Sequence, residues 1–564
     1  MNKIIIISIL LLQAIVLQAQ GTYIPLGSQT YHYIDRFEIK TGLIEGLHSS
    51  NKPYDRKMVM DYIGKVDTGD IEIELTKMDE KNINYIYKDN FEFDLDETIE
   101  RRDRAILGFM YKHPAHLMSV ELPHFKASID PAVYIRMGND FSEKDFKIFN
   151  SKGFELRGQI DNWFGFYAQF LSEQGRFPNY IGNYVKENKV VPRAGYWKEY
   201  KNGGFDYFLA KGYVTFTPSK HIHFQFGYDN NFIGDGIRSM FLSDFTNNYM
   251  FFKINTNVWK FNYENIFAEL TKYYGHGGDG LLGKKYMAMH HLSFNATRWL
   301  NLGIFESVVF SRENHFELQY LNPLIFYRSI EQALGSPDNA FIGFDLKANF
   351  AKHFQIYSQL LLDEFNFSKE FSVPGKGKFY GLFHPNKWWG NKFAAQFGIK
   401  YIDAFGVDHL DIQLEGNVSR PYTYSHTDTV TSWTHYNQPL AHPLGANFKE
   451  IIAEIKYQPI QQLFLSTRFI YSKVGESTKT ENWGNNPIRP YKFVNEFGNY
   501  IGQGVQAKQY YVDFLATYEP WHNIFIDLNY IYRKKNSIDD ARDMQTHFFN
   551  VGLRWSLPYR RYEF

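Results

Sequence analysis

The sequence predicts an all-β transmembrane protein, an antiparallel outer-membrane β-barrel of about 18 strands with a small N-terminal periplasmic helical unit. Three observations predict this fold class. Apolar and polar residues alternate along many segments, short and long connections alternate between those segments, and aromatic residues make up 18% of a chain whose mean hydropathy is only -0.41. Alternation gives each strand one apolar face, so a barrel wall needs no long apolar run of the kind that a membrane-spanning helix has.

Residues 1–20 predict an export signal peptide. The stretch "MNKIIIISILLLQAIVLQAQ" has Lys3, an apolar run from Ile4 to Val16, and Ala19 before a cleavage site near residue 20. A transmembrane helix is the alternative, but the run is short and no apolar span follows it. The chain has no Cys, which excludes a lipid anchor on an N-terminal Cys as well as disulfide bonds. We therefore expect export to the cell outer membrane, where the fold itself contacts the lipid.

Residues 21–118 predict the helical unit. In "SNKPYDRKMVMDYIGKV", Ser50 or Asn51 would cap a helix and Pro53 would lie in its first turn. A second stretch, "DIEIELTKMDEKNINYIYK" (70–88), has apolar residues at helical spacing, although its opening also fits a strand. We expect this unit to lie in the periplasm, where it caps the inner mouth of the barrel or contacts another protein.

Residues 119–564 predict the barrel. In "HLDIQLEGNVS" (409–419), Leu410, Ile412 and Leu414 share one face, and polar residues occupy the other. The final stretch "HFFNVGLRWSL" alternates in the same way, and we expect the last strand to lead to the aromatic C-terminal residue Phe564, as in outer-membrane barrels. Because the assembly machinery reads this strand, we expect truncation at Pro558 to prevent insertion into the outer membrane. The alternative from alternation alone is a large soluble β-sandwich or propeller.

The lengths of the connections favour the barrel, because outer-membrane barrels have tight periplasmic turns and long external loops in alternation. Tight connections are predicted near 161–163, 217–221, 255–257, 296–298, 351–353, 458–462 and 519–522. Long polar stretches cover about 173–205, 229–247, 270–285, 311–339, 365–392, 419–448, 474–507 and 534–545. A short helix at 329–340 and the bulky stretch 375–392 are expected to fold inward and fill the barrel.

The ten tryptophans divide into two groups. Five map to strand ends or turns on the periplasmic side, where indole rings favour the membrane interface: Trp163, Trp259, Trp299, Trp521 and Trp555. The other five lie in the long loops, and together with Tyr491 they are the glycan-binding candidates: Trp197, Trp388, Trp389, Trp433 and Trp483. Exposed tryptophans beside Tyr, Asn and Asp can stack on sugar rings. The alternative is that the loops fold inward and bury these rings.

Signals for other functions are weak. Lys+Arg and Asp+Glu both total 61, so no nucleic-acid partner is expected. The stretch "GDGLLGKK" (278–285) lacks the Ser or Thr of a P-loop. Oxygen ligands at Asp229, Asn231 and Asp235, and histidines at 426, 435 and 442, could hold a cation, but ordinary polar loops explain them more simply. We therefore predict no enzymatic activity, no cofactor and no metal; a phospholipase or protease built from scattered loop residues is the alternative.

Several stretches resemble the Wzi-type outer-membrane proteins of capsule assembly, which include relatives associated with surface motility in gliding bacteria. The resemblance is carried by "YIPLGSQTYHYIDRFEIKTG" (23–42), "KPYDRKMVMDYI" (52–63), "FGYDNNFIGDGIRSMFLSDFTNNYMFF" (226–252), "LNPLIFYR" (321–328) and "DNAFIGFDLKANFAKHFQIYSQLLLDEF" (338–365). It implies an eighteen-stranded barrel with a periplasmic helical unit that binds capsular polysaccharide at the cell surface.

Two functions from different classes remain. The first is a barrel that binds a surface or capsular polysaccharide and assists capsule assembly or attachment, or surface motility. The alternative is an outer-membrane porin or substrate-specific channel, because a barrel this wide has an aqueous lumen unless it is filled. Loops or a plug inside the lumen would favour the first function.

Overall fold

A computed structural model of the chain describes residues 21–93, 115–161, 163–201, 203–275, 280–313, 315–371 and 385–564. The predicted signal peptide, residues 1–20, lies outside the described residues, as does most of the stretch 375–392. No helix in the described ranges is long and apolar enough to cross a membrane.

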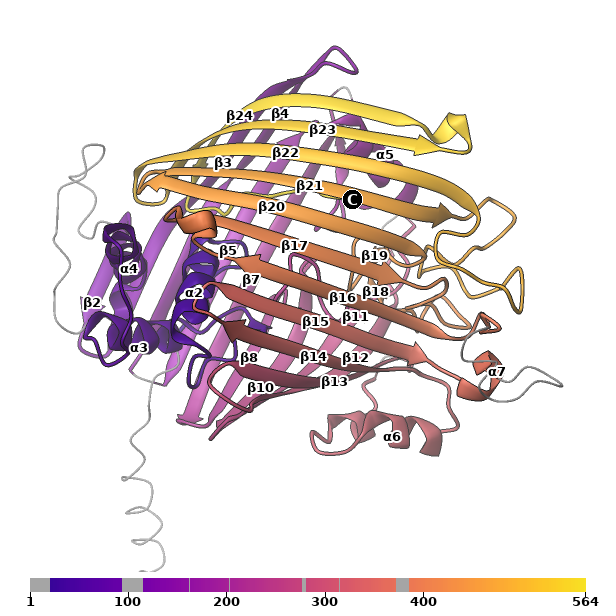
Figure 1. Ribbon diagram of the computed structural model, residues 1–564, viewed down its shortest axis with the longest axis horizontal. Coiled ribbons are helices and arrows are strands. Elements are labelled where there is room, and N and C mark those ends of the chain that lie inside the picture. Colours follow the sequence, from indigo (N-terminus) through magenta and orange to yellow (C-terminus); the bar gives the residue numbers. More distant parts are fainter. Residues whose placement is uncertain are drawn as a thin grey trace, which may run out of the picture.

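Eighteen antiparallel strands form a closed barrel, as predicted (Figure 1). In chain order they are β3 (Phe125–Asp140), β4 (Asp145–Ile160), β5 (Phe164–Gly175), β7 (Gly204–Ser219), β8 (Ile222–Asp229), β10 (Tyr249–Val258), β11 (Phe261–Thr271), β12 (Lys284–Asn295), β13 (Leu300–Phe310), β14 (Asn339–Phe350), β15 (Phe354–Glu364), β16 (Lys392–Tyr401), β17 (Leu410–Ser419), β20 (Phe448–Ile460), β21 (Leu463–Glu476), β22 (Val505–Trp521), β23 (Ile524–Ser537) and β24 (Met544–Trp555). β24 pairs with β3 and closes the barrel. β2 (Met118–Leu122) adds to β3, and β6 (Lys198–Tyr200) adds to β7.

The connections follow the predicted alternation. Strands are joined at one end, the tight-turn end, by residues 161–163, 220–221, 259–260, 296–299, 351–353, 402–409, 461–462 and 522–523. Apart from the short 141–144 hairpin, the connections at the other end, the loop end, are mostly long. The predicted turn at 255–257 is wrong, because those residues belong to β10 and the chain turns at Trp259, whose φ is 55°.

The strands present apolar side chains outward and polar side chains inward. On β24, Phe549, Val551 and Leu553 are exposed, whereas Asn550 and Arg554 are buried toward the lumen. This is the arrangement expected of a wall with lipid outside. The five tryptophans predicted for the girdle all lie at the tight-turn end, and Trp259 and Trp299 are the most exposed of them, at 73% and 53%.

The N-terminal unit contains α2 (Gln29–Thr41), α3 (Arg56–Asp67) and α4 (Lys77–Asp89), which lie at the tight-turn end of the barrel (Figure 1). Two predicted helix starts are wrong. α3 starts after Asp55, whose carboxylate accepts a hydrogen bond from the Met58 amide, because Asn51 and Lys52 instead pair with β9 (Phe232–Ile233) as strand β1. α4 starts after Thr76 in a capping box, so the alternating residues before it stay outside the helix.

The C-terminus departs from the prediction. β24 ends at Trp555, and the tail from Ser556 to Phe564 turns into the lumen, where the Phe564 ring lies 4.6 Å from that of Tyr184. The tail carries Arg560, Arg561 and Glu563, which cannot face lipid without a large cost. Phe564 is therefore not part of the lipid-facing wall.

The connection at 311–338 also departs from the prediction. Its helix α6 (Tyr327–Ala333) ends before Gly335, whose φ is 93°, but it lies outside the barrel wall instead of filling the lumen (Figure 1). Other loops do fold inward, and they are described below.

Candidate functional site

The six predicted glycan-binding residues separate into two sets. Trp388, Trp389 and Tyr491 meet at the loop end, whereas Trp197, Trp433 and Trp483 lie apart from them in other contacts. Trp433 is only 1% exposed, its ring contacts those of Phe305 and Phe341, and its indole N–H donates to the carbonyl oxygen of Phe241 at 2.9 Å. Trp433 therefore belongs to the packed interior.

Trp197 and Trp483 are half-buried and support their own loops. The Trp197 indole donates to the carbonyl oxygen of Lys189 at 2.9 Å, and its ring contacts Phe205 edge-on at 4.9 Å. The Trp483 indole donates to the Glu481 carboxylate at 3.2 Å, and its ring lies against Gly504. Each has a local packing partner, so neither needs a ligand to explain its position.

The remaining rings form the loop-end aromatic cluster, which consists of Trp388, Trp389, Tyr491 and Phe493. The Trp389 ring stacks on Phe493 at 4.6 Å and 17°, and it lies 4.8 Å from Tyr491 and 5.7 Å from Trp388. Trp388 is buried, Trp389 and Tyr491 are half-buried, and Phe493 is 43% exposed. The cluster thus has a buried base and an exposed edge.

Hydrogen bonds hold the two loops of the cluster together and also join them to the 420–447 loop. The Trp389 amide donates to the carbonyl oxygen of Glu496 at 2.9 Å, and the Tyr491 amide donates to that of His426 at 3.1 Å. The Trp388 amide donates to the Glu370 carboxylate at 2.9 Å. These bonds join residues far apart in the sequence, so the rings are positioned by the loops as a unit.

Two lysines border the cluster. The ammonium of Lys369 lies 4.4 Å from the centre of the Trp388 ring, and that of Lys392 lies 5.0 Å from the centre of the Tyr491 ring. Cations over aromatic faces are attracted to the ring electrons. Lys392 is buried and pairs with Asp363 at 2.8 Å, whereas Lys369 is exposed. The site therefore combines aromatic faces with one exposed hydrogen-bond donor, Lys369, a combination that suits a sugar with apolar ring faces and hydroxyl groups.

The histidine and the tyrosine at the cluster are neutral at pH 7. Burial, together with the nearby charge of Lys392, lowers the pKa of His426 to about 4. Burial and the carboxylates of Glu364 and Asp363 raise the pKa of Tyr491 to about 12. A neutral phenol and a neutral imidazole suit hydrogen bonding to hydroxyl groups better than proton transfer.

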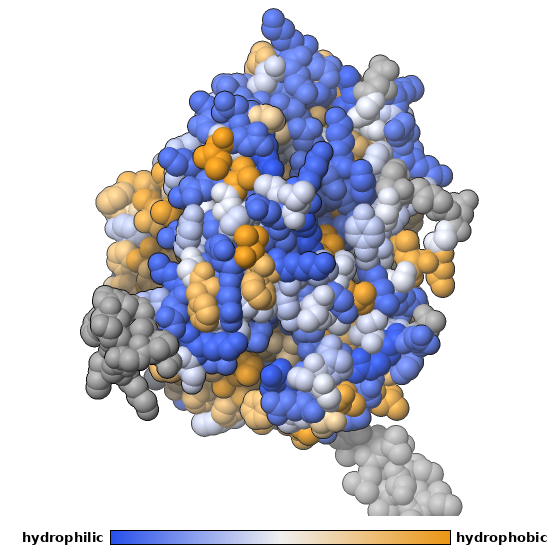
Figure 2. Space-filling model, turned by 90° about the vertical axis from the view of Figure 1, so that its right-hand side faces the viewer, coloured by the Kyte–Doolittle hydropathy of each residue, from blue (hydrophilic) through white to orange (hydrophobic). Residues whose placement is uncertain are grey.

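Phe493 was absent from the sequence-based candidates, which were selected as loop tryptophans with one tyrosine. The exposed aromatic residues Phe497 and Tyr500 follow it in the same loop, at 47% and 50%. Their spacing in "YKFVNEFGNY" (491–500) was the signal available in the sequence. Figure 2 shows the loop end face-on as a largely hydrophilic surface with separate hydrophobic patches.

The weak cation candidates have other partners. Asp229 pairs with Lys211 at 2.6 Å, Asn231 accepts from Lys253 at 3.1 Å, and Asp235 pairs with Lys347 at 3.1 Å. Within the described part of the chain, no group of three His, Asp or Glu side chains is placed to hold a metal ion.

The lumen is filled from the tight-turn end by the N-terminal unit. Arg36 donates to Asp403 at 2.7 Å and also to Asp411, Lys400 of β16 pairs with Asp35 at 2.7 Å, and Lys347 of β14 pairs with Glu38 at 2.9 Å. Burial would raise the pKa of Asp35, but the charges of Lys400 and Lys52 outweigh it and lower that pKa. The helices are thus joined to the wall by charged contacts on α2.

The lumen is filled from the loop end by residues 230–248 and 420–447. Ile233, Met240 and Phe241 of the first loop are fully buried, and the Phe241 ring stacks on Phe305 of the wall at 4.6 Å and 8°. The Gln359 side chain of β15 donates to the carbonyl oxygen of Ile233 at 3.0 Å. The hydrogen bond from Trp433 to Phe241 joins the two loops.

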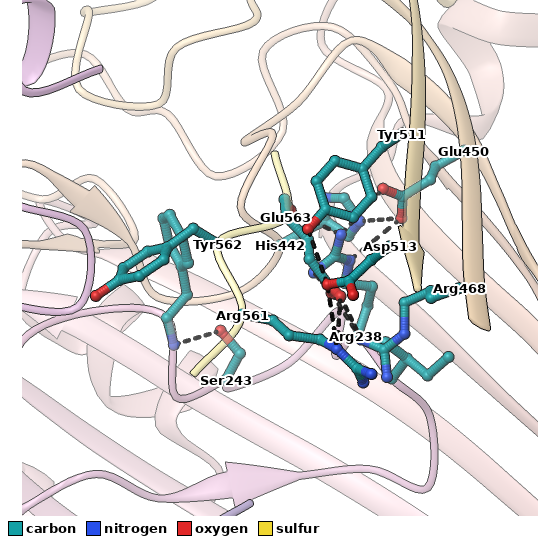
Figure 3. Close-up of polar contacts among 12 residues, drawn as sticks. Arg238, Ser243, His442, Glu450, Arg468, Tyr511, Asp513, Arg561, Tyr562 and Glu563 are labelled. Atoms are coloured by element: carbon teal, nitrogen blue, oxygen red, sulfur yellow. Dashed lines mark hydrogen bonds and ion pairs between the residues drawn. The ribbon is translucent and has the colours of Figure 1, made fainter. Parts of the chain in front are cut away.

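The C-terminal tail joins these elements at the centre of the barrel (Figure 3). Glu563 accepts from Arg468 of β21 at 2.6 Å and 2.8 Å, and Arg238 of the first loop donates to the carbonyl oxygen of Glu563 at 2.8 Å. Arg561 pairs with Glu454 of β20 at 3.0 Å. A chamber of about 550 Å³ remains between the N-terminal unit, the tail and the wall.

The fold and these contacts define an outer-membrane β-barrel whose lumen is occupied from both ends and which displays an aromatic cluster on its loops. No family model and no curated protein matches the chain. Among solved structures, the chain is similar to Wzi of Escherichia coli, with a TM-score of 0.56 and 12% identity over 96% of this chain and 99% of that chain. Wzi is described as an outer-membrane protein involved in group 1 capsule assembly and as a carbohydrate-binding β-barrel.

Two proteins of Pseudomonas aeruginosa give lower scores. OprD has a TM-score of 0.40 and 11% identity over 76% of this chain and 94% of that chain. OpdQ has a TM-score of 0.39 and 11% identity over 76% of this chain and 97% of that chain. At 12% identity, the likeness to Wzi establishes the shared barrel fold.

Proposed function

We propose that this protein binds a surface or capsular polysaccharide at the loop end of an occluded outer-membrane barrel and assists its assembly or attachment, in a capsule or in a motility-associated surface layer. The observation that carries the proposal is the loop-end aromatic cluster, in which Trp389, Tyr491 and Phe493 meet at a partly exposed edge and Lys369 lies exposed over the Trp388 ring. The description of Wzi as carbohydrate-binding supports it.

In this proposal, the loop end faces the cell exterior and the N-terminal unit lies in the periplasm. The outward surfaces of α3 and α4 are charged, with Asp61, Lys65, Glu80 and Lys81 exposed. Such a surface suits contact with a periplasmic protein, and that contact is part of the proposal. The reaction chemistry of an enzyme is not needed for this role.

A substrate-specific channel is the second candidate, and the chamber of about 550 Å³ is the observation that favours it. In that case, the tail and the inward loops would have to separate to connect the chamber with both ends of the barrel. The two candidates make opposite predictions for conductance, because a filled lumen passes little current.

Two experiments test the proposal. Purified detergent-solubilised protein on a glycan array is expected to bind a defined class of acidic or neutral polysaccharide. The same protein in planar bilayers is expected to give no large steady conductance. Binding without conductance supports the occluded glycan-binding barrel; steady conductance without binding would contradict it and favour the channel.

A further inference from the structure

The connection between β13 and β14 runs along the outside of the barrel. We call residues 317–334 the outer-wall segment; it contains η2 (Leu318–Leu321) and α6. Tyr320, Tyr327 and Ile330 of the segment pack with a set of buried wall residues that includes Phe267, Tyr286, Ala288, Val308 and Phe310. Figure 1 shows α6 on the outer side of the wall beside β13.

The alternation of β13 identifies the covered face. Leu302 and Ile304 are 40% and 47% exposed on the outside, and Glu306, Val308 and Phe310 continue the same face toward the loop end. The last three are buried because the outer-wall segment covers them. The segment therefore occupies a position that lipid occupies beside the neighbouring strands.

A polar group lies under the segment on this outer face. Glu306 and His290 contact each other at 2.8 Å, the Tyr263 hydroxyl lies 3.0 Å from the other ring nitrogen of His290, and the Arg328 amide donates to Glu306 at 3.1 Å. The Tyr327 ring stacks on His290 at 4.2 Å and 11°. A charged side chain on the lipid face of a barrel is destabilising. The segment satisfies and shields this group.

The outer surface of the segment has large apolar side chains together with exposed polar ones, which are Gln319, Asn322, Arg328, Ser329 and Gln332. Leu318, Leu324 and Phe326 are 75%, 86% and 70% exposed, and Leu321 and Ile325 are 41% and 39% exposed. At the ends of the connection Arg312 lies 2.9 Å from Asp338, and within α6 Arg328, whose side chain is 52% exposed, lies 2.8 Å from Glu331. Water would be a poor solvent for the apolar side chains.

The segment also reaches far down the wall. The Tyr263 hydroxyl donates to the carbonyl oxygen of Pro323, and Tyr263 is close to the tight-turn end of β11. On β14, the ladder partner of Glu306 is Ile342, which is 37% exposed, and Phe344 beyond it is 46% exposed. The apolar surface of the segment is thus continuous with the lipid-facing band of the barrel.

We propose that the outer-wall segment is inserted among the acyl chains of the outer membrane, so that lipid covers Leu318, Leu324 and Phe326. Two observations favour lipid over water as the surroundings of the segment. Its apolar side chains are continuous with the lipid-facing wall, and it covers a polar group on that wall. A second copy of the chain is the competing occupant, and the test below distinguishes it.

The absence of Cys from the chain makes single-site labelling direct. Leu324→Cys would carry an environment-sensitive fluorophore in phosphatidylcholine vesicles containing either spin-labelled lipid or an aqueous quencher. Ile304→Cys is the matched control for the lipid-facing wall, and Ile538→Cys, a 72% exposed side chain at the loop end, is the matched control for water. None of these side chains is buried, so the barrel should fold.

The expected result is that the label in Leu324→Cys has blue-shifted emission and is quenched several-fold more by the spin-labelled lipid than by the aqueous quencher, as at Ile304. Quenching like that at Ile538 would overturn the proposal in favour of water. Protection from both quenchers, with efficient cross-linking of Leu324→Cys into a dimer, would overturn it in favour of a second copy. Phe326→Cys repeats the test if the first variant labels poorly.

Discussion

The carboxylate of Glu563, one residue before the C-terminus, accepts hydrogen bonds of 2.6 Å and 2.8 Å from the guanidinium of Arg468 in β21. Both side chains are buried. Arg238, from the inward loop, donates to the backbone carbonyl of Glu563. The end of the chain thus connects the barrel wall with the loop that fills the lumen.

Glu563→Gln is expected to lower the free energy of unfolding by up to about 3 kcal/mol, because it leaves Arg468 buried without its full counter-charge. Burial would raise the pKa of Glu563, but Arg468, Arg238 and Arg561 outweigh it and lower that pKa. A lowered carboxyl pKa contributes stability above the unfolded value of about 4.3, and that contribution is lost as the pH falls through the folded pKa.

The measurement is the unfolding temperature of each protein between neutral and acidic pH. Glu563→Gln should lose this part of the acid dependence, whereas Glu72→Gln, an exposed site in the N-terminal unit, should behave like the parent. Equal acid dependence in all three proteins would show that Glu563 does not stabilise the fold.

Deletion of residues 559–564 is expected to leave a barrel that inserts into membranes, because β24 ends at Trp555 and its pairing with β3 does not use the tail. The truncated barrel should unfold at lower temperature and conduct more ions in planar bilayers. Arg238 and Arg468 lose their contacts with Glu563, which hold the inward loop 230–248 in the lumen. Failure to insert would instead support the sequence-based expectation that the terminal aromatic residue directs assembly.

Arg36→Met is expected to release the N-terminal unit from the barrel mouth. Arg36 is buried between Asp403 and Asp411, and removing it leaves these buried carboxylates with only Lys40 and His32 as partners, at a cost of about 3 kcal/mol. Limited proteolysis should cut α2 to α4 faster in this variant. Lys57→Met, which breaks an exposed pair with Asp61, should change the rate of proteolysis little. Equal rates of proteolysis in both variants would contradict the role of Arg36 in holding the N-terminal unit.

Trp433→Ala is expected to lower the free energy of unfolding by about 3–5 kcal/mol, because it removes a large buried ring and its hydrogen bond to Phe241. Glycan affinity, measured below the unfolding transition, should be retained. If Trp433→Ala has normal stability but no longer binds glycan, Trp433 belongs to the binding site and this prediction is wrong.

The barrel could be predicted from the sequence because its signals are local. Alternation along a segment such as 409–419 and the contrast between turns and loops do not depend on distant contacts. The position of the tail in the lumen could not be predicted in this way, because Glu563 contacts Arg468 across a sequence separation of 95 residues. "PYRRYEF" fits a strand end as well as an inward tail until those partners are known.

The other departures have similar causes. α3 starts late because Asn51 and Lys52 pair with β9, which belongs to a loop from the opposite end of the barrel. The aromatic cluster unites two loops, so the contact between Trp389 and Phe493 could not be predicted from the sequence. One signal was available in the sequence for the outer-wall segment. Glu306 falls on the lipid side of β13, where its carboxylate must be shielded from lipid.

The central claim is that the loop-end aromatic cluster holds a polysaccharide while the filled barrel only supports it. The most direct measurement is the affinity of purified protein for polysaccharide extracted from the producing cell surface, compared between the parent, Trp389→Ala and Trp299→Ala. Losing the ring that stacks on Phe493 and contacts Tyr491 should weaken binding by roughly tenfold, equivalent to about 1.4 kcal/mol, with little change in unfolding temperature. Trp299→Ala, at the tight-turn end, should bind normally. Unchanged affinity in Trp389→Ala, or an equal loss in both variants, would contradict the account.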